Sequence, residues 1–292
     1  MSSSAAPRPA RTPEPAGGPP DPHPGDTRAA SAEPAYDPEH HHRLVGALRE
    51  LGVESGMTVL VHSALRATGI RSGPLRRALR AALGADGTLV APAFTEANSD
   101  TSHVYRARIA GMTPGEVVAH RAAMPAFDPD ATPSQGMGRL AESIRTAPGA
   151  VRSAHPQTSF TALGRRAGEL LARHPLACHL GDDSPLGALH RADAHALMIN
   201  VDFDVCTAFH LAEYRTGSPL RTYRCVVRRP GGGRSWVEYE DVRLDDSDFG
   251  AIGASFTWGL EQKGQLGGRP ARLFSVRAAV DHAVEWMAEK RR

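Results

Sequence analysis

Apolar residues along the chain alternate between short continuous runs and helically spaced stripes, a pattern typical of α/β proteins. Residues 41–51 carry leucine and valine at helical spacing, and Gly52 is suited to end that helix. The runs TVLV at 58–61 and TLVA at 88–91 predict buried strands, and between them Pro74 opens an amphipathic helix. A strand, a helix and a strand in this order predict a parallel pair joined by a right-handed crossover.

Turn and capping residues divide the rest of the chain in the same way. Pro148-Gly149 ends one helical stripe, Ser184-Pro185 begins another helix, and Pro230 followed by three glycines marks a hairpin. The further predicted elements are helices over 135–146, 159–172, 207–216 and 276–289, a strand over 196–201, and hairpin strands over 222–228 and 235–240. We therefore predict an α/β fold with a central mixed, partly parallel sheet flanked by helices.

The N-terminal segment differs from the rest of the chain in composition. Residues 1–38 hold ten of the 23 prolines, and no Leu, Ile, Val, Phe or Trp occurs before Leu44. Such a segment buries too little apolar surface to offset the entropy lost on ordering it. We predict a disordered proline-rich tail over 1–38 and a single α/β domain over 39–292. The run His40-His41-His42 has no accompanying ligand pattern, so we interpret it as a solvated helix edge rather than a metal site.

Composition excludes several classes of protein. The chain has 292 residues, of which 41% are hydrophobic and 23% charged, so it is globular rather than fibrous. Its net charge of +2 is less basic than expected of a general nucleic-acid binder. There is no apolar run of membrane-spanning length and no apolar segment typical of a secretory signal. The three cysteines have no C-x-x-C spacing, which disfavours a disulfide framework or structural zinc and favours a cytoplasmic location.

Polar residues follow three of the predicted strands at the point where each strand ends. His62-Ser63-Ala64-Leu65 follows the first strand, PAFT at 92–95 the second, and DVCTAFHLAE at 204–213 a third. In open α/β sheets, ligands bind beyond the carboxyl ends of the strands. We therefore expect these three segments to form one site.

The third segment carries the strongest catalytic candidates. On a helix, Cys206, Thr207, His210 and Glu213 would share one face. A histidine with a glutamate one turn away can act as a general base, because the carboxylate fixes the imidazole tautomer. The same spacing also occurs where a partly buried histidine is merely satisfied, and spacing alone favours that interpretation. Cys206 could be a nucleophile, but most free cysteines are small buried hydrophobes.

Other signals are weaker. His62-Ser63 could bind a phosphate at a strand end, or it could satisfy groups of its own loop. Residues 136–141 match G-x-G-x-x-A, but no predicted strand precedes them, so a dinucleotide site is not supported. The acidic run over 238–248 is by default a solvated surface, and it would favour a polycationic substrate if it bordered the site.

Motifs in a fixed order resemble the aminoglycoside N(3)-acetyltransferase family. They are HPQTSFTALG at 155–164, GDDSPLGALH at 181–190 and DVCTAFHLAE at 204–213, with VHSAL at 61–65, GTLVAPAFT at 87–95, residues 127–156, and Trp236 with Glu240-Asp241. The resemblance covers the chain from about residue 41 onward. It implies a fold distinct from the common acetyltransferase superfamily, acetyl-CoA as donor, no metal, and an aminoglycoside or other polyamine as acceptor.

The resemblance also implies roles for individual residues. His210 would be the general base, oriented by a carboxylate that is either Glu213 or an acid of the Glu240-Asp241 pair. The residues implied to hold the donor are His62, Ser63, Ala64, Leu65, His155, Ser159 and Phe160. Those implied to bind the acceptor are Asp204, Thr207 and Glu240. Many members of the family carry a second serine where this chain has Ala64, so one hydroxyl near the phosphates is missing.

The first hypothesis is an enzyme of antibiotic resistance that acetylates the 3-amino group of a 2-deoxystreptamine ring, and three alternatives compete with it. The first alternative is a biosynthetic N-acyltransferase that uses an acyl-CoA on a different amine. The second is a CoA-binding protein without turnover, which the intact Asp204, Thr207, His210 and Glu213 disfavour. A thiol hydrolase built on Cys206 is the weakest interpretation. The sequence does not predict an oligomeric state.

Overall fold

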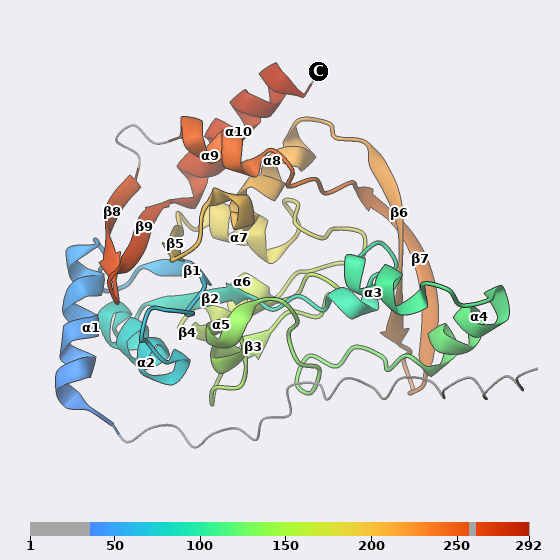
Figure 1. Cartoon of the computed structure of the whole chain (residues 1–292), viewed down its shortest axis with the longest axis horizontal. Helices are drawn as coiled ribbons and strands as arrows, with labels where there is room; N and C mark the ends of the chain where they lie inside the picture. Colours follow the sequence, from blue (N-terminus) through green and yellow to red (C-terminus); the bar gives the residue numbers. More distant parts are fainter. Residues whose placement is uncertain (1–35, 257–260, 292) are drawn as a thin grey trace, which may run out of the picture. The chain divides into compact units, whose positions relative to one another are not determined.

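The computed structural model describes residues 36–256 and 261–291, and the predicted tail falls outside this range apart from residues 36–38. A seven-stranded sheet runs through the described part (Figure 1). In spatial order its strands are β3 (Val151–Arg152), β4 (Phe160–Gly164), β2 (Thr88–Pro92), β1 (Thr58–Ser63), β5 (His195–Ile199), β9 (Arg269–Ser275) and β8 (Glu261–Leu266).

The three central strands are parallel and the outer ones antiparallel. Strand β1 pairs in parallel with β2 on one side and with β5 on the other. Strands β4 and β9 pair antiparallel with β2 and β5. The sheet is therefore mixed and partly parallel, and the predicted fold class is confirmed.

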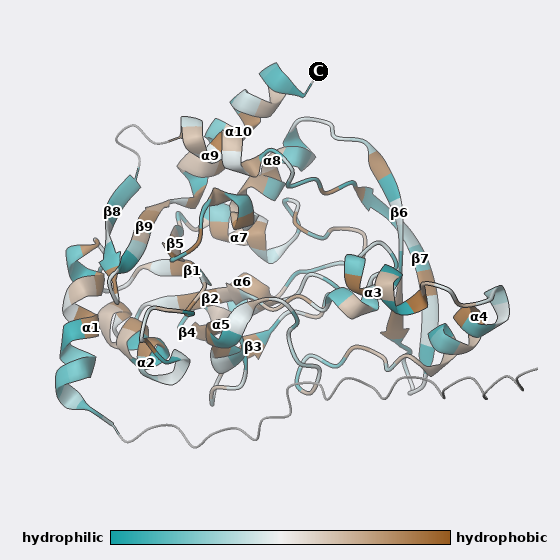
Figure 2. Ribbon diagram, in the orientation of Figure 1, coloured by the Kyte–Doolittle hydropathy of each residue, from teal (hydrophilic) through white to brown (hydrophobic). Residues whose placement is uncertain are grey.

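Helices cover both faces of this sheet, which explains why the central strands are continuous apolar runs. Successive residues of a strand point to opposite faces, so Val59 and Val61 belong to one core and Leu60 to the other. The first core includes α1 (Pro38–Glu50), α2 (Ser72–Leu83) and α5 (Gly138–Arg145). The second includes α6 (Ala167–Leu171), α7 (Pro185–Arg191), α8 (His210–Arg215), α9 (Phe249–Ser255) and α10 (Val276–Lys290). Figure 2 shows the hydrophilic and hydrophobic bands of α1.

A separate two-stranded ribbon of β6 (Leu220–Arg228) and β7 (Arg234–Val242) confirms the predicted hairpin. Helices α3 (His103–Ile109) and α4 (Pro114–Ala123) follow a short 3-10 turn, Glu96–Asn98, and lie beside this ribbon (Figure 1). A small third core joins them, in which Tyr105 stacks on Trp236 and Met124 and Val226 are buried. The Asn98 side chain accepts from the Val226 N–H and donates to its carbonyl, which fixes the ribbon to the turn.

Most of the predicted helices are present with small changes at their ends. Helix α1 begins at Pro38 because Asp37 accepts a hydrogen bond from the His40 N–H, three residues before the predicted start. Ser184 caps α7 as predicted, by accepting from the Leu186 N–H. The predicted helix over 207–216 begins as a 3-10 turn, Thr207–Phe209, before α8.

The predicted helix over 159–172 is wrong. Its first part forms β4, and only Ala167–Leu171 is helical. Apolar residues in this stretch recur at helical spacing. The antiparallel pairing with β2 nevertheless makes its first part a strand, because the pairing supplies backbone hydrogen bonds and buries the strand in the sheet. Gly164 ends the strand at a φ of 141°, where a side chain would collide with the Gly87 carbonyl. Strands β8 and β9, which the sequence did not predict, form the other flank of the sheet.

Candidate functional site

The site is built at one edge of the sheet. Because β1 pairs in parallel with β2 and β5, the three strands end at the same edge, and the three predicted polar segments follow them there. The Ala64 N–H donates to the carbonyl of Ile199, so the first loop is tied to the end of β5. The convergence expected from the sequence is confirmed.

A histidine–glutamate pair stands in the first turn of α8. His210 Nδ1 lies 2.7 Å from Oε2 of Glu213, and the Glu213 side chain is fully buried. Its other oxygen accepts from the Asp245 N–H and from Arg291, each over 2.8 Å. With Nδ1–H donated to the carboxylate, Nε2 carries the lone pair. Within the described residues Nε2 has no hydrogen-bond partner, and the His210 side chain is 14% exposed, so Nε2 can accept a proton.

The other carboxylate considered for this role points elsewhere. Asp241 Oδ2 lies 2.5 Å from Nδ1 of His179, accepts from the His179 N–H over 2.6 Å and accepts from the Tyr214 hydroxyl over 2.7 Å. Burial alone would raise the pKa of Asp241, but these hydrogen bonds outweigh it and hold the pKa below its usual range. Glu240 is exposed, as expected for the neighbour of a buried residue on a strand. The structure therefore places Glu213, and neither of these acids, against His210.

Asp241 belongs to a buried polar network that the sequence did not predict. His179 Nε2 lies 2.9 Å from the Gln157 side-chain oxygen and 3.0 Å from the Tyr239 hydroxyl. This network joins the ribbon, through Tyr239 and Asp241, to α8, through Tyr214. Residues this far apart along the chain carry no joint sequence signal, because only the fold brings them together.

Three residues expected to hold the donor are buried in the interior. His155, Ser159 and Phe160 have exposed fractions of 0%. His155 Nε2 bonds the Leu176 carbonyl and its Nδ1 accepts from two backbone N–H groups, and Ser159 donates to the Ala93 carbonyl. Burial and two neighbouring histidines lower the pKa of His155 well below its usual value. The polar side-chain atoms of His155 and Ser159 are thus used inside the protein, and Phe160 packs in the core, so contact of these three residues with the donor stays a prediction.

The loop after β1 is better suited to an anion. The N–H groups of residues 65, 66 and 67 have no hydrogen-bond acceptor among the described residues, and Ala67 has a positive φ of 61°. Consecutive free N–H groups with one left-handed residue form a concave anion site. His62 precedes this loop, and burial lowers its pKa to about 4, so it is neutral at pH 7. Its Nε2 is buried without a partner in the described part of the chain.

The remaining predicted residues lie between β5 and α8. Asp204 is exposed on a 3-10 turn, Phe203–Val205, and Thr207 is 7% exposed at the start of the next turn. Cys206 is fully buried, and desolvation raises the pKa of its thiol to about 12. A thiolate nucleophile is therefore disfavoured at this position, as the sequence analysis expected.

Comparisons with known proteins agree over nearly all of the described chain. A family model described as aminoglycoside 3-N-acetyltransferase matches residues 60–288. The YokD protein of Bacillus subtilis, an aminoglycoside N(3')-acetyltransferase-like protein, is 35% identical over 82% of this chain and 89% of its own length. Aminoglycoside N(3)-acetyltransferase VIII of Streptomyces fradiae is 34% identical over 88% of this chain and 95% of its own.

Solved structures show the same fold. The crystal structure of YokD superposes with a TM-score of 0.79 and covers 86% of this chain and 99% of its own. Two others carry ligands. AAC-VIa bound to sisomicin has a TM-score of 0.73, 31% identity and coverage of 86% and 97%. AAC-IIIb in a binary complex with CoASH has a TM-score of 0.74, 29% identity and coverage of 86% and 96%.

Proposed function

The chain belongs to the aminoglycoside 3-N-acetyltransferase family, and from this premise we propose that it transfers an acetyl group from acetyl-CoA to the 3-amino group of the 2-deoxystreptamine ring of an aminoglycoside. Members of this family are acyltransferases. The proposal of a CoA donor draws on the CoASH complex of AAC-IIIb, and that of an aminoglycoside acceptor on the sisomicin complex of AAC-VIa. A resistance role follows, since acetylation removes a positive charge from the antibiotic.

The observation that carries the proposal is the pair of His210 and Glu213. An aminoglycoside amine is mostly protonated at neutral pH, so a base must keep its lone pair available for attack. His210 Nε2 would take the proton as the amine attacks the acyl carbon, while Glu213 stabilises the charge that forms on the imidazole. The C–S bond of the thioester would then break, and CoA would leave as the thiol after taking up a proton. General-base catalysis of this kind contributes about 10²–10⁴-fold to the rate.

Transfer is proposed to be direct. A covalent acyl-enzyme would need an activated nucleophile near His210, and the adjacent Cys206 is buried with its thiol protonated. His210 therefore serves the incoming amine itself. Positioning the amine against the acyl carbon supplies much of the remaining rate enhancement.

The donor is proposed to lie along the loop after β1. Acetyl-CoA supplies an activated thioester when bound. The free N–H groups of residues 65–67 fit its pyrophosphate, and Arg66 adds an exposed guanidinium that has no ion pair within the described residues. Ser63 and Leu65 are half-buried beside these groups, so they could contact the same ligand. Glu240 and Asp204 are exposed acids that we propose as acceptor contacts.

The test is an assay of thiol release with acetyl-CoA and a panel of aminoglycosides, followed by mass spectrometry of the products. The proposal is supported if each aminoglycoside product carries one added acetyl group and NMR places that group on the 3-amino nitrogen. Expression in a sensitive bacterium should then raise the inhibitory concentration of the same compounds. CoA binding without turnover on any aminoglycoside would contradict the proposed acceptor and favour a biosynthetic acyltransferase.

A further inference from the structure

The ribbon of β6 and β7 is joined to the rest of the chain at one end. Leu220, the first residue of β6, pairs with Val242, the last residue of β7. Residues 216–219 link β6 to α8, and residues 243–248 link β7 to α9. The ribbon therefore begins beside the helix that carries His210, and contacts at this end set its position relative to that helix.

One side chain of α8 bonds the ribbon directly. Tyr214, one turn after His210, donates its hydroxyl proton to Oδ2 of Asp241 over 2.7 Å. The same hydroxyl accepts from the Leu180 N–H over 3.2 Å. Among the described residues, no other side chain of α8 forms a hydrogen bond to β6 or β7. Because Asp241 is the penultimate residue of β7, this bond ties the base of the ribbon to α8.

The chain leaves room for the Tyr214 ring at Gly181, the first residue of the motif GDDSPLGALH. An added Cβ at Gly181 would lie 2.5 Å from Cδ1 of the ring, so a side chain there would displace the ring. Burial and the nearby Asp241 carboxylate raise the pKa of Tyr214, so its hydroxyl stays protonated and can donate. The hydroxyl is thus a donor held at one place against the ribbon.

The Asp241 carboxylate also joins the ribbon to the segment before α7. Its Oδ2 accepts from the His179 N–H over 2.6 Å, and its Oδ1 accepts from the Val242 N–H over 2.8 Å. Hydrogen bonds to a charged group are stronger than neutral ones, and a buried carboxylate that loses a donor is destabilised. Removing the Tyr214 hydroxyl should therefore weaken the attachment of the ribbon at this end.

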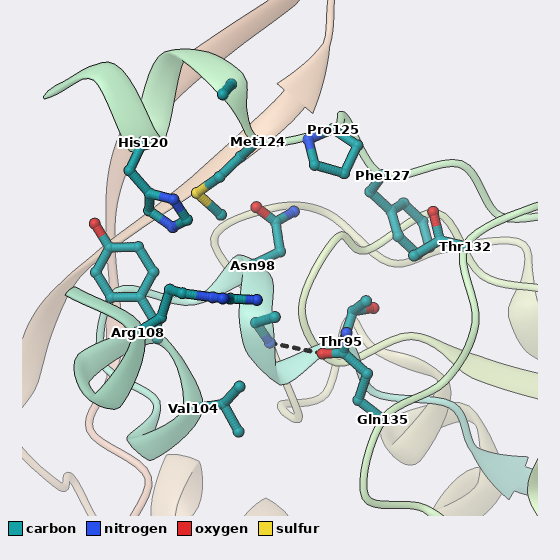
Figure 3. Close-up of a pocket in the computed structure, with 13 residues that line it drawn as sticks. Thr95, Asn98, Val104, Arg108, His120, Met124, Pro125, Phe127, Thr132 and Gln135 are labelled. Carbon is teal, nitrogen blue, oxygen red and sulfur yellow. Dashed lines mark hydrogen bonds between the residues drawn. The ribbon is translucent and has the colours of Figure 1, made fainter. Parts of the chain in front are cut away.

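A separate contact holds the ribbon farther along β6. The Asn98 side chain bonds the N–H and the carbonyl of Val226, and Asn98 also lines the pocket shown in Figure 3. A strand rises about 3.3 Å per residue, so Val226 is roughly 20 Å along β6 from Leu220. This contact is far from the base of the ribbon, where Tyr214 acts.

We propose that Tyr214 is a positioning residue for acyl transfer, which sets the separation between His210 and the acceptor contact on the ribbon. Glu240, the exposed acid that we assign to the acceptor, directly precedes Asp241. An acceptor with one amine at His210 and another at Glu240 needs both groups at a fixed separation. Without the Tyr214 hydroxyl that separation varies, and an error of about 1 Å can lower a rate by about 10²-fold. The inference rests on the proposed function, because it assumes that acceptor.

The kinetic test is Tyr214→Phe, which removes the hydroxyl and keeps the ring. We expect kcat/KM for the aminoglycoside to fall about tenfold through a rise in KM, because the two acceptor contacts are no longer held in register. The Kd of CoA, measured by calorimetry, should stay within about twofold of wild type. A loss of folded enzyme lowers kcat without raising KM, so the KM separates the two effects. An unchanged KM would overturn the proposal.

Tyr223→Phe is the matched control. The Tyr223 hydroxyl is also hydrogen-bonded inside the protein, but it donates to the Val242 carbonyl and accepts from the Leu244 N–H. Neither partner lies in α8. This variant should lose comparable stability and keep the wild-type KM. An equal rise in KM in both variants would show a general loosening of the ribbon and contradict the role of Tyr214.

Amide hydrogen exchange tests the attachment without any substrate. In Tyr214→Phe the His179 N–H, which donates to Asp241, should exchange about tenfold faster. The Val226 N–H, which donates to Asn98, should exchange as in the wild type. If the wild type acetylates no aminoglycoside, the proposed function fails, and the exchange of His179 still decides whether Tyr214 holds the ribbon. An unchanged exchange rate at His179 would overturn the inference even in an active enzyme.

Discussion

Arg291 donates a hydrogen bond over 2.8 Å to Oε1 of Glu213, the oxygen of that carboxylate that does not contact His210. The same guanidinium donates to Asp248, with Nε at 2.7 Å from Oδ2. One positive charge is thus shared by two carboxylates beside the proposed base. Arg291 follows α10 and does not touch the His210 ring, so we class it as a positioning residue.

Arg291→Ala should lower kcat/KM at pH 7 about tenfold by exposing His210 to an uncompensated Glu213 carboxylate. A more negative neighbour favours the protonated imidazole, which cannot act as a base, so the acid limb of the pH profile should move to higher pH. Arg291→Lys keeps the charge and should restore part of the loss. Lys290→Ala, at an exposed neighbouring position, is the control. A lower kcat with an unmoved pH profile would indicate a purely structural role.

Removing the base itself should have a larger effect. His210→Ala is expected to reduce kcat by about 10²–10⁴-fold while the Kd for CoA stays within a few-fold, because the histidine acts on the amine rather than on the donor. Steady-state kinetics and calorimetry measure the two quantities. His42→Ala, an exposed histidine of α1, should leave both unchanged. Activity near that of the wild type in His210→Ala would show that the base is assigned wrongly.

Cys206→Ala should leave activity within about threefold of wild type, because a buried thiol with a pKa of about 12 is neither ionised nor accessible at pH 7. Iodoacetamide should accordingly not label Cys206 in the native protein. Mass spectrometry of peptides after labelling checks this directly. An inactive Cys206→Ala variant that is still folded would favour a covalent mechanism.

The free energy of unfolding should fall as pH decreases from about 6.5 to 4. Burial lowers the pKa of His62 and of His174 to about 4, from the ordinary histidine value of about 6.5. Below pH 6.5 the unfolded chain therefore binds protons that the native protein does not, and stability is lost until the folded pKa is reached. Each histidine contributes up to about 3 kcal/mol to this loss of stability. His174→Gln should therefore flatten the dependence of the free energy of unfolding on pH, as measured by denaturant unfolding. His42→Gln should retain the wild-type slope, and an unchanged slope in His174→Gln would contradict the assignment.

Asp241→Asn should destabilise the fold by about 1–3 kcal/mol, because it removes the carboxylate that accepts from His179 and Tyr214 inside the protein. The neighbouring Glu240→Gln is the control, since Glu240 is exposed and its replacement should stay within about 0.5 kcal/mol. Thermal unfolding measures both. Equal stability of the two variants would mean that the buried network does not hold the ribbon to the body.

The central strands and the flanking helices could be predicted because each carries its own signal. β1, β2 and β5 are apolar runs bounded by turns, and α1 and α7 begin at capping residues. It was also predictable that the three strands end at the same edge of the sheet, because they run parallel. The spacing of His210 and Glu213 made their pairing one of the possibilities that the sequence offered. The structure added what spacing could not show, namely the contact itself and the burial of Glu213.

What could not be predicted depends on contacts that are distant along the chain. β4 has helically spaced apolar residues, and only its pairing with β2 makes it a strand. The choice between Glu213 and Asp241 was open until the structure placed His179 against Asp241. Arg291 has no local pattern at all, because only the packing of α10 against α8 brings it to Glu213.

Strand β1 precedes one of its two neighbours, β5, by more than 130 residues along the chain. A nascent chain that has passed β2 therefore holds an apolar strand with one open edge until β5 emerges from the ribosome. Open edges of apolar strands are templates for aggregation, and pairing over such separations slows folding. This protein should accordingly depend on chaperones while it is being translated, and it should refold slowly and with concentration-dependent losses after denaturation.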